Sequence, residues 1–318
     1  MSDVIIIGAG PAGISAALYT IRSGLETTVI TAGDSALAKA EKIENYYGFA
    51  EPISGKELLT RGIDGAERLG VKFTNKQAVS IDYEDGGFSV VTSDDKKHGC
   101  KAVLLATGSR RLAPSIEGLT EFEGKGVSYC AVCDAFFYRN KNVGVLGSGE
   151  YALHEAKILA KTSKSVTVFT NGEEPTAVFP SEFTIVKEPL SSLTGEAKIE
   201  KAVLRDGTEV KIDGLFVAYG VASSAALAQK AGAVTIGGKI RVNDSMMTNV
   251  NGLFAAGDCT GGLLQVSKAV GDGAAAGMAI IKYVKREKYS RRNYPISKND
   301  PWPSVFEPAV KGRSFFIF

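Results

Sequence analysis

The chain has 318 residues, of which 44% are apolar, and it carries four cysteines and a formal net charge of +2. This length allows two domains of roughly 100–200 residues each. A charge so close to zero gives no reason to expect nucleic acid or a membrane surface as a partner, and no window approaches the ~18 continuous apolar residues of a membrane span. Four cysteines without a secretory signal argue against an extracellular disulfide scaffold. We therefore expect a soluble, cytoplasmic α/β protein.

The first predicted strand, over residues 4–7, is apolar and leads directly into a glycine-rich turn and an apolar helix. The turn has the G-x-G-x-x-G pattern in its strand–turn–helix context, which is typical of dinucleotide binding. Its glycines permit the tight turn, the approach of a pyrophosphate to the backbone and close packing of the helix, while the helix start favours the phosphates. The residues predicted to hold the dinucleotide here are Gly8, Gly10, Pro11, Ala12 and Gly13.

A redox motif follows in the middle of the chain, where Cys130 and Cys133 are separated by two residues and followed by Asp134. This spacing lets the sulfurs form a disulfide at the start of a helix, where a thiolate is stabilised. Asp134 is placed to supply or remove the proton that opening and closing require. A structural disulfide or half of a zinc site is the alternative. A zinc site would need two more ligands, and the other candidates have no suitable spacing: Cys100, Cys259, His98 and His154.

A second strand–turn–helix unit is predicted from a strand at 141–146, a helix through Ala160 and a strand at 165–170. Its turn reads Gly147-Ser148-Gly149-Glu150-Tyr151-Ala152, and a carboxylate such as that of Glu150 would repel a pyrophosphate. The following strand end lacks the arginine that an NADP 2′-phosphate requires, and Glu173 comes three residues late for an NAD ribose. We expect a degenerate nucleotide-binding fold that serves as a scaffold for the cysteine pair.

The last predicted strand, at 252–258, ends in Gly257-Asp258 and precedes a helix from about Gln265. Asp258 could accept a hydrogen bond from a ribityl hydroxyl, or it could simply cap a helix. The helix start at Gln265 and Val266 could stabilise negative charge on a reduced flavin. Together with the first glycine turn, these residues predict a flavin site.

The run Cys-Ala-x-Cys-Asp-x-Phe-Phe-Tyr from Cys130, with the first glycine turn and the segments 43–48, 106–108 and 256–258, resembles the low-molecular-weight thioredoxin reductase family over roughly residues 1–285. The resemblance implies two Rossmann-like dinucleotide-binding-type domains of three-layer ββα architecture, the smaller inserted in the larger. It also implies FAD, thioredoxin as partner, and a homodimer whose small domain rotates. The residues expected against FAD are Asn45, Thr107, Gly108, Asp258, Gln265 and Val266.

The domain boundaries follow from these segments. We expect an FAD-binding domain made of residues 1–114 and 243–318, and a dithiol domain of residues 115–242. The end of the chain, at 289–318, holds Trp302 and four phenylalanines. It reads either as a mobile or dimer-packing tail or as an aromatic cover that stacks on the isoalloxazine. The basic run at 282–292 is either an ordinary solvent-exposed surface or a surface that attracts an acidic ferredoxin.

The NADPH signature of the family, a Gly-Gly-Gly-x-Ser-Ala turn and a His-Arg-Arg cluster, is replaced here by the turn at 147–152 and by Thr170-Asn171-Gly172. The chain is therefore most similar to the ferredoxin-dependent flavin thioredoxin reductases, which implies reduced ferredoxin as electron donor. The resemblance places Cys133 near the flavin, makes Cys130 the thiol that attacks the partner disulfide, and makes Asp134 the acid/base. The alternatives are an NAD(P)H-dependent disulfide reductase and a non-catalytic flavin-bound redox sensor.

Overall fold

The computed structural model describes residues 1–33, 35–84, 86–108, 114–220 and 222–290, with side chains described through residue 286. The aromatic residues at the end of the chain lie outside the described residues, and so does the end of the basic run. Among the helices that are described, none combines the length and the apolar character that crossing a membrane requires.

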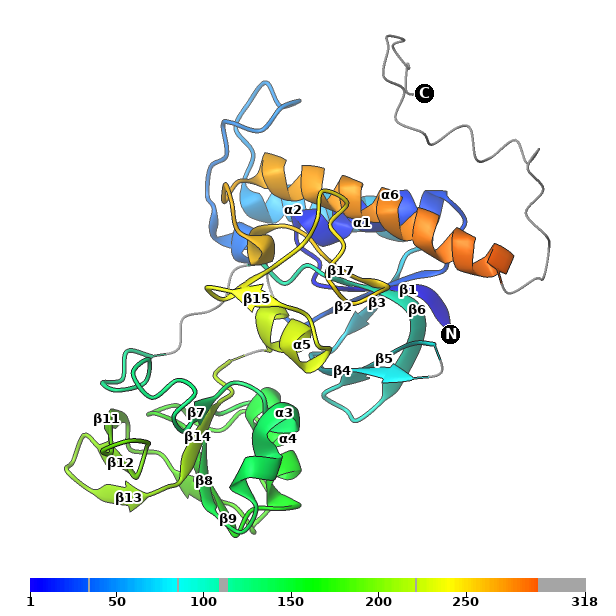
Figure 1. Ribbon diagram of the computed structural model, residues 1–318. Coiled ribbons are helices and arrows are strands. Elements are labelled where there is room, and N and C mark those ends of the chain that lie inside the picture. Colours follow the sequence, from blue (N-terminus) through cyan, green and yellow to red (C-terminus); the bar gives the residue numbers. More distant parts are fainter. Residues whose placement is uncertain (34, 85, 109–113, 221, 291–318) are drawn as a thin grey trace.

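The larger of the two main sheets is mixed and has seven strands in the order β3-β2-β1-β6-β5-β4, with β17 also pairing with β6 (Figure 1). Strands β1, β2, β3, β6 and β17 run parallel, and β4 and β5 add an antiparallel extension. The apolar run in β1 is buried because both faces of a parallel sheet are covered. The strands are β1 (Ser2–Ile7), β2 (Thr27–Thr31), β3 (Lys72–Asn75), β4 (Ala78–Glu84), β5 (Gly87–Thr92), β6 (Lys97–Leu105) and β17 (Leu253–Ala255).

Helices α1 (Pro11–Arg22), α2 (Gly55–Arg68) and α6 (Val266–Ser290) lie together beside this sheet in Figure 1. Small residues let α1 and α6 approach closely, because a Cβ at Gly273 would collide with the carbonyl of Ala12. Two short 3-10 helices, η1 (Ala36–Lys39) and η3 (Asp258–Thr260), follow β2 and β17. Because Gly273 of α6 lies against Ala12 of α1, the N-terminal parts of the two helices lie side by side.

The smaller sheet has five parallel strands in the order β10-β9-β8-β14-β7. A three-stranded antiparallel sheet accompanies it, and helices α3, η2 and α4 complete this unit. The element bounds are β7 (Val127–Ser128), α3 (Ala131–Asp134), η2 (Ala135–Tyr138), β8 (Asn142–Leu146), α4 (Glu150–Ala160), β9 (Ser165–Phe169), β10 (Thr184–Val186), β11 (Leu190–Thr194), β12 (Lys201–Leu204), β13 (Glu209–Lys211) and β14 (Gly214–Val217). This unit is inserted between β6 and β17 of the larger sheet, which confirms the predicted two-domain α/β fold.

Helix α5 (Ser224–Lys230) lies between the two sheets in Figure 1 and packs against β4 and β6 of the larger one. The short strands β15 (Thr235–Ile236) and β16 (Lys239–Ile240) follow it, and β16 contacts α5 and η3. Because these contacts belong to the larger domain, we propose that the chain returns to that domain at α5. This return comes earlier than residue 243, where the sequence places it.

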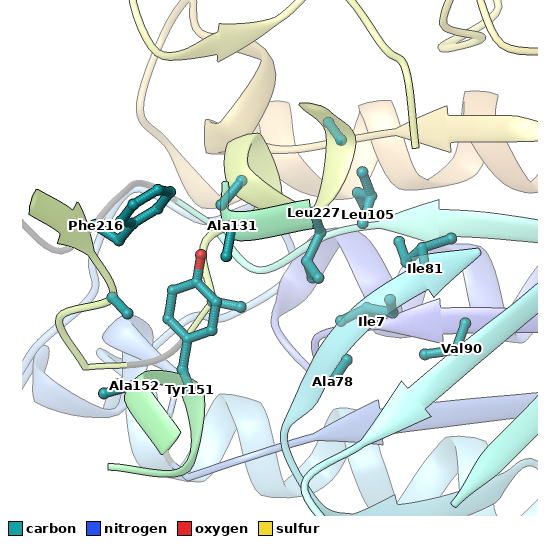
Figure 2. Packing of buried hydrophobic residues seen from close by; sticks show 14 of the residues in the cluster. Ile7, Ala78, Ile81, Val90, Leu105, Ala131, Tyr151, Ala152, Phe216 and Leu227 are labelled. Atoms are coloured by element: carbon teal, nitrogen blue, oxygen red, sulfur yellow. The ribbon is translucent and has the colours of Figure 1, made fainter. Parts of the chain in front are cut away.

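The two domains share one buried apolar cluster (Figure 2). The larger domain contributes Ile7 and Leu105 from parallel strands, and α5 contributes Leu227. The smaller domain contributes Ala131, next to the cysteine pair, and Tyr151 from the start of α4. The segment that carries the cysteines is therefore packed against the larger domain.

Candidate active site

The first glycine turn forms one end of a pocket in the larger domain. Gly8 has a φ of 112°, which favours glycine, and a Cβ at Gly13 would overlap the carbonyl oxygen of Gly8. Gly10 is the N-cap of α1, so that the start of the helix offers backbone N–H groups to a phosphate. The pocket is lined by four of the five residues predicted for this turn, Gly8, Gly10, Pro11 and Ala12, while Gly13 holds the helix against the turn.

The other predicted flavin residues gather at the same pocket, although they are far apart in the chain. Asp258, Gln265 and Val266 line it, together with Thr107 and Gly108. Asn45 reaches the same site because its side-chain amide donates to Gln265 Oε1 at 3.1 Å. The predicted helix start near Gln265 is confirmed, since α6 begins at Val266.

Thr107 makes contacts that sequence reasoning did not predict. Its Oγ1 lies 2.6 Å from Ser224 Oγ and accepts from the backbone N–H of Ser224 at 2.9 Å. Ser224 begins α5, and the neighbouring Ser223 lines the pocket. Thr107 thus ties α5 to the edge of the flavin pocket as well as lining it.

A lysine that sequence reasoning missed holds the turn around Asp258. Lys268 Nζ donates to the carbonyl oxygens of Gly257 at 2.9 Å and Gly261 at 2.7 Å, and to Thr260 Oγ1 at 3.0 Å. It also pairs with Asp272 at 2.7 Å, and Asp272 accepts from the backbone N–H of Gly257 at 3.0 Å. A lysine and an aspartate four residues apart on a helix ordinarily form a solvated pair, so their spacing alone does not indicate this role.

Replacing Lys268 by Met is expected to weaken FAD binding by roughly 30-fold, because hydrogen bonds to a charged donor contribute about 1.5–3 kcal/mol. The Gly257–Gly261 turn would lose the hydrogen bonds that Lys268 donates to it, and Asp272 would lose its positively charged partner. Titration of FAD into the apoprotein, followed by flavin fluorescence, measures the change. Lys285→Met, an exposed position on the same helix, is the matched control and should bind FAD like the wild type. Equal affinities in the two variants would contradict this role of Lys268.

The cysteine pair lies at the start of α3. Cys130 and Cys133 form a disulfide, with a Cα–Cα distance of 5.3 Å, which confirms that the spacing allows them to bond. Cys130 is the N-cap of α3, and its Sγ accepts from the backbone N–H of Cys133 at 3.1 Å. Cys130 is buried, at 5% exposure, while Cys133 is exposed. A sulfur at a helix start is stabilised as a thiolate when the disulfide opens.

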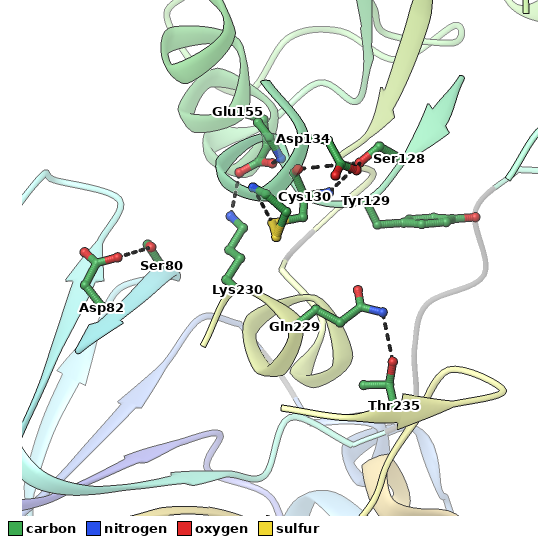
Figure 3. The surroundings of a disulfide bond; sticks show 12 residues. Ser80, Asp82, Ser128, Tyr129, Cys130, Asp134, Glu155, Gln229, Lys230 and Thr235 are labelled. Atoms are coloured by element: carbon green, nitrogen blue, oxygen red, sulfur yellow. Dashed lines mark hydrogen bonds and ion pairs between the residues drawn. A yellow bond between two sulfur atoms is a disulfide. The ribbon is translucent and has the colours of Figure 1, made fainter. Parts of the chain in front are cut away.

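Asp134 is fixed close to the disulfide. Its Oδ2 accepts from the hydroxyl of Ser128 at 2.7 Å, and the backbone N–H of Asp134 donates to the carbonyl of Cys130 at 3.2 Å (Figure 3). Ser128 also accepts from the backbone N–H of Cys130 at 3.1 Å. The carboxylate is therefore one hydroxyl away from the backbone of the first cysteine.

The two remaining cysteines have no comparable chemistry. Burial raises the pKa of the Cys100 thiol to about 12 and that of Cys259 to about 11. A thiol with such a pKa is almost entirely protonated near neutral pH and is a poor nucleophile. Thiol chemistry in this chain therefore belongs to Cys130 and Cys133.

The second glycine turn is occupied by a carboxylate from its own domain. Glu173 accepts from the hydroxyl of Ser148 at 2.6 Å and from the phenol of Tyr219. The hydrogen bond to Glu173 raises the pKa of Tyr219 to about 12. Tyr151, the second unusual residue of this turn, is buried, and its hydroxyl donates to the carbonyl of Tyr129 at 3.2 Å. Glu173 thus places negative charge beside the turn where a nucleotide pyrophosphate would bind.

A profile of the family described as pyridine nucleotide-disulphide oxidoreductase matches residues 2–273. The chain belongs to this family. The thioredoxin reductase of Aquifex aeolicus (strain VF5) is 33% identical over 304 residues, which cover 90% of this chain and 94% of that protein. This member of the family is thus a flavin disulfide oxidoreductase of the thioredoxin reductase type, and the predicted FAD cofactor is confirmed.

Two solved structures of this type are similar to the chain over about nine tenths of its length. The atypical thioredoxin reductase TRi from Desulfovibrio vulgaris Hildenborough is 39% identical with a TM-score of 0.85, covering 90% of this chain and 99% of that one. A ferredoxin-flavin thioredoxin reductase from Clostridium acetobutylicum is 31% identical with a TM-score of 0.69, covering 91% and 98%. The predicted fold of this family member is confirmed by these similarities.

Proposed function

We propose that this chain reduces the disulfide of thioredoxin, and that its electrons come from reduced ferredoxin rather than from NADPH. The observation that carries the proposal is the pair of unlike glycine turns: the first opens onto a pocket suited to FAD, and the second faces the carboxylate of Glu173. The ferredoxin-flavin thioredoxin reductase from Clostridium acetobutylicum, at 31% identity, supports the choice of donor.

The surface beside the disulfide supports a protein as the electron acceptor. Val132, between the two cysteines, is exposed, and so are Phe136 and Phe137 in η2. Exposed aromatic side chains at a reactive site are typical of protein–protein contact, where they supply most of the binding free energy. A thioredoxin whose own disulfide lies in an apolar surface would fit this patch.

The chemistry assigns a role to each residue of the motif. When bound, FAD supplies electron pairs collected from a one-electron donor. Opening the disulfide takes two electrons and two protons, and we assign Cys133 to the flavin side and Asp134 to the proton. Cys130 then attacks the thioredoxin disulfide to form a mixed disulfide, and Cys133 resolves it by restoring the bond to Cys130. Two electrons enter and two leave in each cycle.

Glu173 argues against a nicotinamide donor on electrostatic grounds. Its carboxylate would repel a pyrophosphate at the second turn, and the strand end from Thr170 to Gly172 carries no cation to hold a 2′-phosphate. Each oxygen of Glu173 already accepts one hydrogen bond, from Ser148 and from Tyr219, so a ribose would have to share this carboxylate with two residues of the same domain.

Anaerobic mixing of the FAD-loaded protein with electron donors tests the proposal. NADPH and NADH are expected to leave the flavin absorbance near 450 nm unchanged over minutes, while reduced ferredoxin bleaches it and generates thioredoxin thiols. Rapid bleaching by either nucleotide would support the NAD(P)H-dependent alternative instead. Bleaching by ferredoxin without thioredoxin thiols would support the redox sensor. The homodimer implied by the family is a further prediction, which light scattering measures directly.

A further inference from the structure

A buried ion pair joins the two domains directly behind the cysteine pair. Glu155 of α4, in the smaller domain, lies 2.5 Å from Nζ of Lys230 at the end of α5. Each side chain is only 1% exposed. Lys230 also donates to the carbonyl of Val79 in β4 at 3.0 Å, and its Nζ lies 4.9 Å from the centre of the Tyr151 ring. Lys230 is thus anchored in the larger domain and reaches into the smaller one.

The same ion pair reaches the redox motif through the second oxygen of Glu155. Glu155 Oε2 accepts from the backbone N–H of Ala131 at 2.7 Å, and Ala131 is the residue that follows Cys130. A continuous series of contacts therefore runs from β4 through Lys230 and Glu155 to the first turn of the cysteine helix. Figure 3 shows Lys230 extending from α5 toward Glu155 and this turn.

The two cysteines differ in access. Cys130 is 5% exposed, whereas Cys133 is exposed. Ala131 packs in the buried cluster that includes Leu227 of α5 (Figure 2). In the function proposed above, Cys130 is the thiol that must reach a sulfur of thioredoxin, and a nucleophile so well covered cannot meet a protein partner. The docked arrangement has to open before Cys130 can react.

We propose that Glu155 and Lys230 are positioning residues that form a latch between the domains: the pair docks the disulfide segment against the FAD-binding domain, and its release exposes Cys130 to the partner protein. This inference rests on the proposed function for the role of Cys130. The docking itself rests on the contacts of Lys230 with Glu155 and Val79.

An ion pair suits a latch that must open in every cycle. The attraction between two buried charges is largely offset by the loss of their hydration, so both can return to water at small net cost. Removing only one partner is different, because it leaves the other charge buried without compensation. The docked state therefore requires both residues, while opening of the intact pair stays reversible. Tyr151 adds a cation–π contact on the docked side only, since its ring lies in the smaller domain.

The position of Tyr151 also explains the altered second glycine turn. In that turn its ring takes the place of a small residue, lies in the shared cluster and faces Lys230. This residue of the second glycine turn is thus part of the docking surface.

The test measures the distance between the domains in the FAD-loaded protein with its disulfide intact. Nitroxide labels at Lys72→Cys in β3 and Lys164→Cys in the smaller domain, both exposed positions, report the distance by pulsed electron paramagnetic resonance. The protein with Glu155 and Lys230 intact should give one dominant distance between the two labels. Lys230→Met should lower the ratio of docked to open molecules by at least about tenfold, because it leaves Glu155 buried alone.

The chain offers a matched control that also crosses the domains. Lys157 of α4 pairs with Asp95 at 3.4 Å, but these side chains are 45% and 70% exposed. A surface pair contributes little, so Lys157→Met should keep the dominant distance. Glu155→Gln is a second variant, used in case Lys230→Met fails to fold. It retains an acceptor for the backbone N–H of Ala131. It should also open the domains, and the double variant should open them no further than Lys230→Met alone.

A second measurement follows access to the sulfur itself. After reduction, alkylation by iodoacetamide is timed at each cysteine by mass spectrometry, and Cys133 serves as the internal reference. Lys230→Met should raise the rate at Cys130 relative to Cys133 by about tenfold, whereas Lys157→Met should leave the ratio unchanged. Unchanged distances in both Lys230→Met and Glu155→Gln, or an unchanged alkylation ratio, would overturn the latch. Neither readout needs ferredoxin, NADPH or thioredoxin, so failure of the latch is distinguishable from failure of the proposed function.

Discussion

A Cys130→Ser protein is expected to purify with its full content of FAD and to lose thioredoxin reduction by roughly a thousandfold or more, since it lacks the attacking thiol. The flavin pocket does not include Cys130 among its lining residues, so the yellow colour should be retained. The release of thioredoxin thiols, measured with a chromogenic disulfide and reduced ferredoxin as donor, gives the rate. Loss of FAD together with turnover would contradict the separation of the two sites.

The Cys133→Ser protein separates the roles of the two sulfurs. Its Cys130 can still attack thioredoxin but cannot be released, so a mixed disulfide with the partner should accumulate and be visible on a non-reducing gel. If the mixed disulfide accumulated in the Cys130→Ser protein instead, Cys133 would be the thiol that attacks thioredoxin and Cys130 the one that resolves the mixed disulfide. Cys100→Ala is the control, because this buried thiol, with its pKa raised to about 12, takes no part in exchange and its loss should leave turnover unchanged.

The features that sequence reasoning predicted well are local. The strand–turn–helix at the first glycine motif depends on residues close together in the sequence. The observed β1 begins two residues before the predicted strand, and α1 begins at Pro11, already within the glycine turn. The bond between Cys130 and Cys133 is equally local, because two intervening residues bring the sulfurs together at a helix start. Such signals lie in spacing and residue type, which the sequence displays directly.

The features that were missed depend on contacts between distant parts of the chain. Glu155 and Lys230 read as ordinary charged helix residues, and only folding brings them together across 75 positions. The hydrogen bond between Glu173 and Ser148, 25 positions apart, is likewise not visible in the sequence. The contacts of α5 with β4 and β6 are equally hidden in the sequence, since a short helix of small residues carries no mark of the sheet that it will cover.

A Gly13→Ala protein is expected to lose most of its FAD and part of its stability, although the change adds a single methyl group. The added Cβ would overlap the carbonyl oxygen of Gly8, which is backbone and cannot turn aside as a side chain would. Helix α1 must then move away from the glycine turn, at a cost of about 1–3 kcal/mol for overpacking, and the phosphate cradle widens. We expect less than about a tenth of the normal FAD content, measured as the ratio of absorbance at 450 and 280 nm.

Gly65→Ala makes the comparison decisive because it adds the same methyl group to a helix where nothing lies within 4 Å of the new Cβ. Alanine in the middle of α2 should stabilise the protein by roughly 0.5–1 kcal/mol and leave FAD binding unchanged. If both variants kept their flavin, the close contact between Gly13 and Gly8 would not be what shapes the pocket. If only Gly13→Ala lost it while its unfolding remained cooperative, the effect would lie in the approach of the helix start to the pyrophosphate. The site would then depend on backbone placement more than on any side chain that lines it.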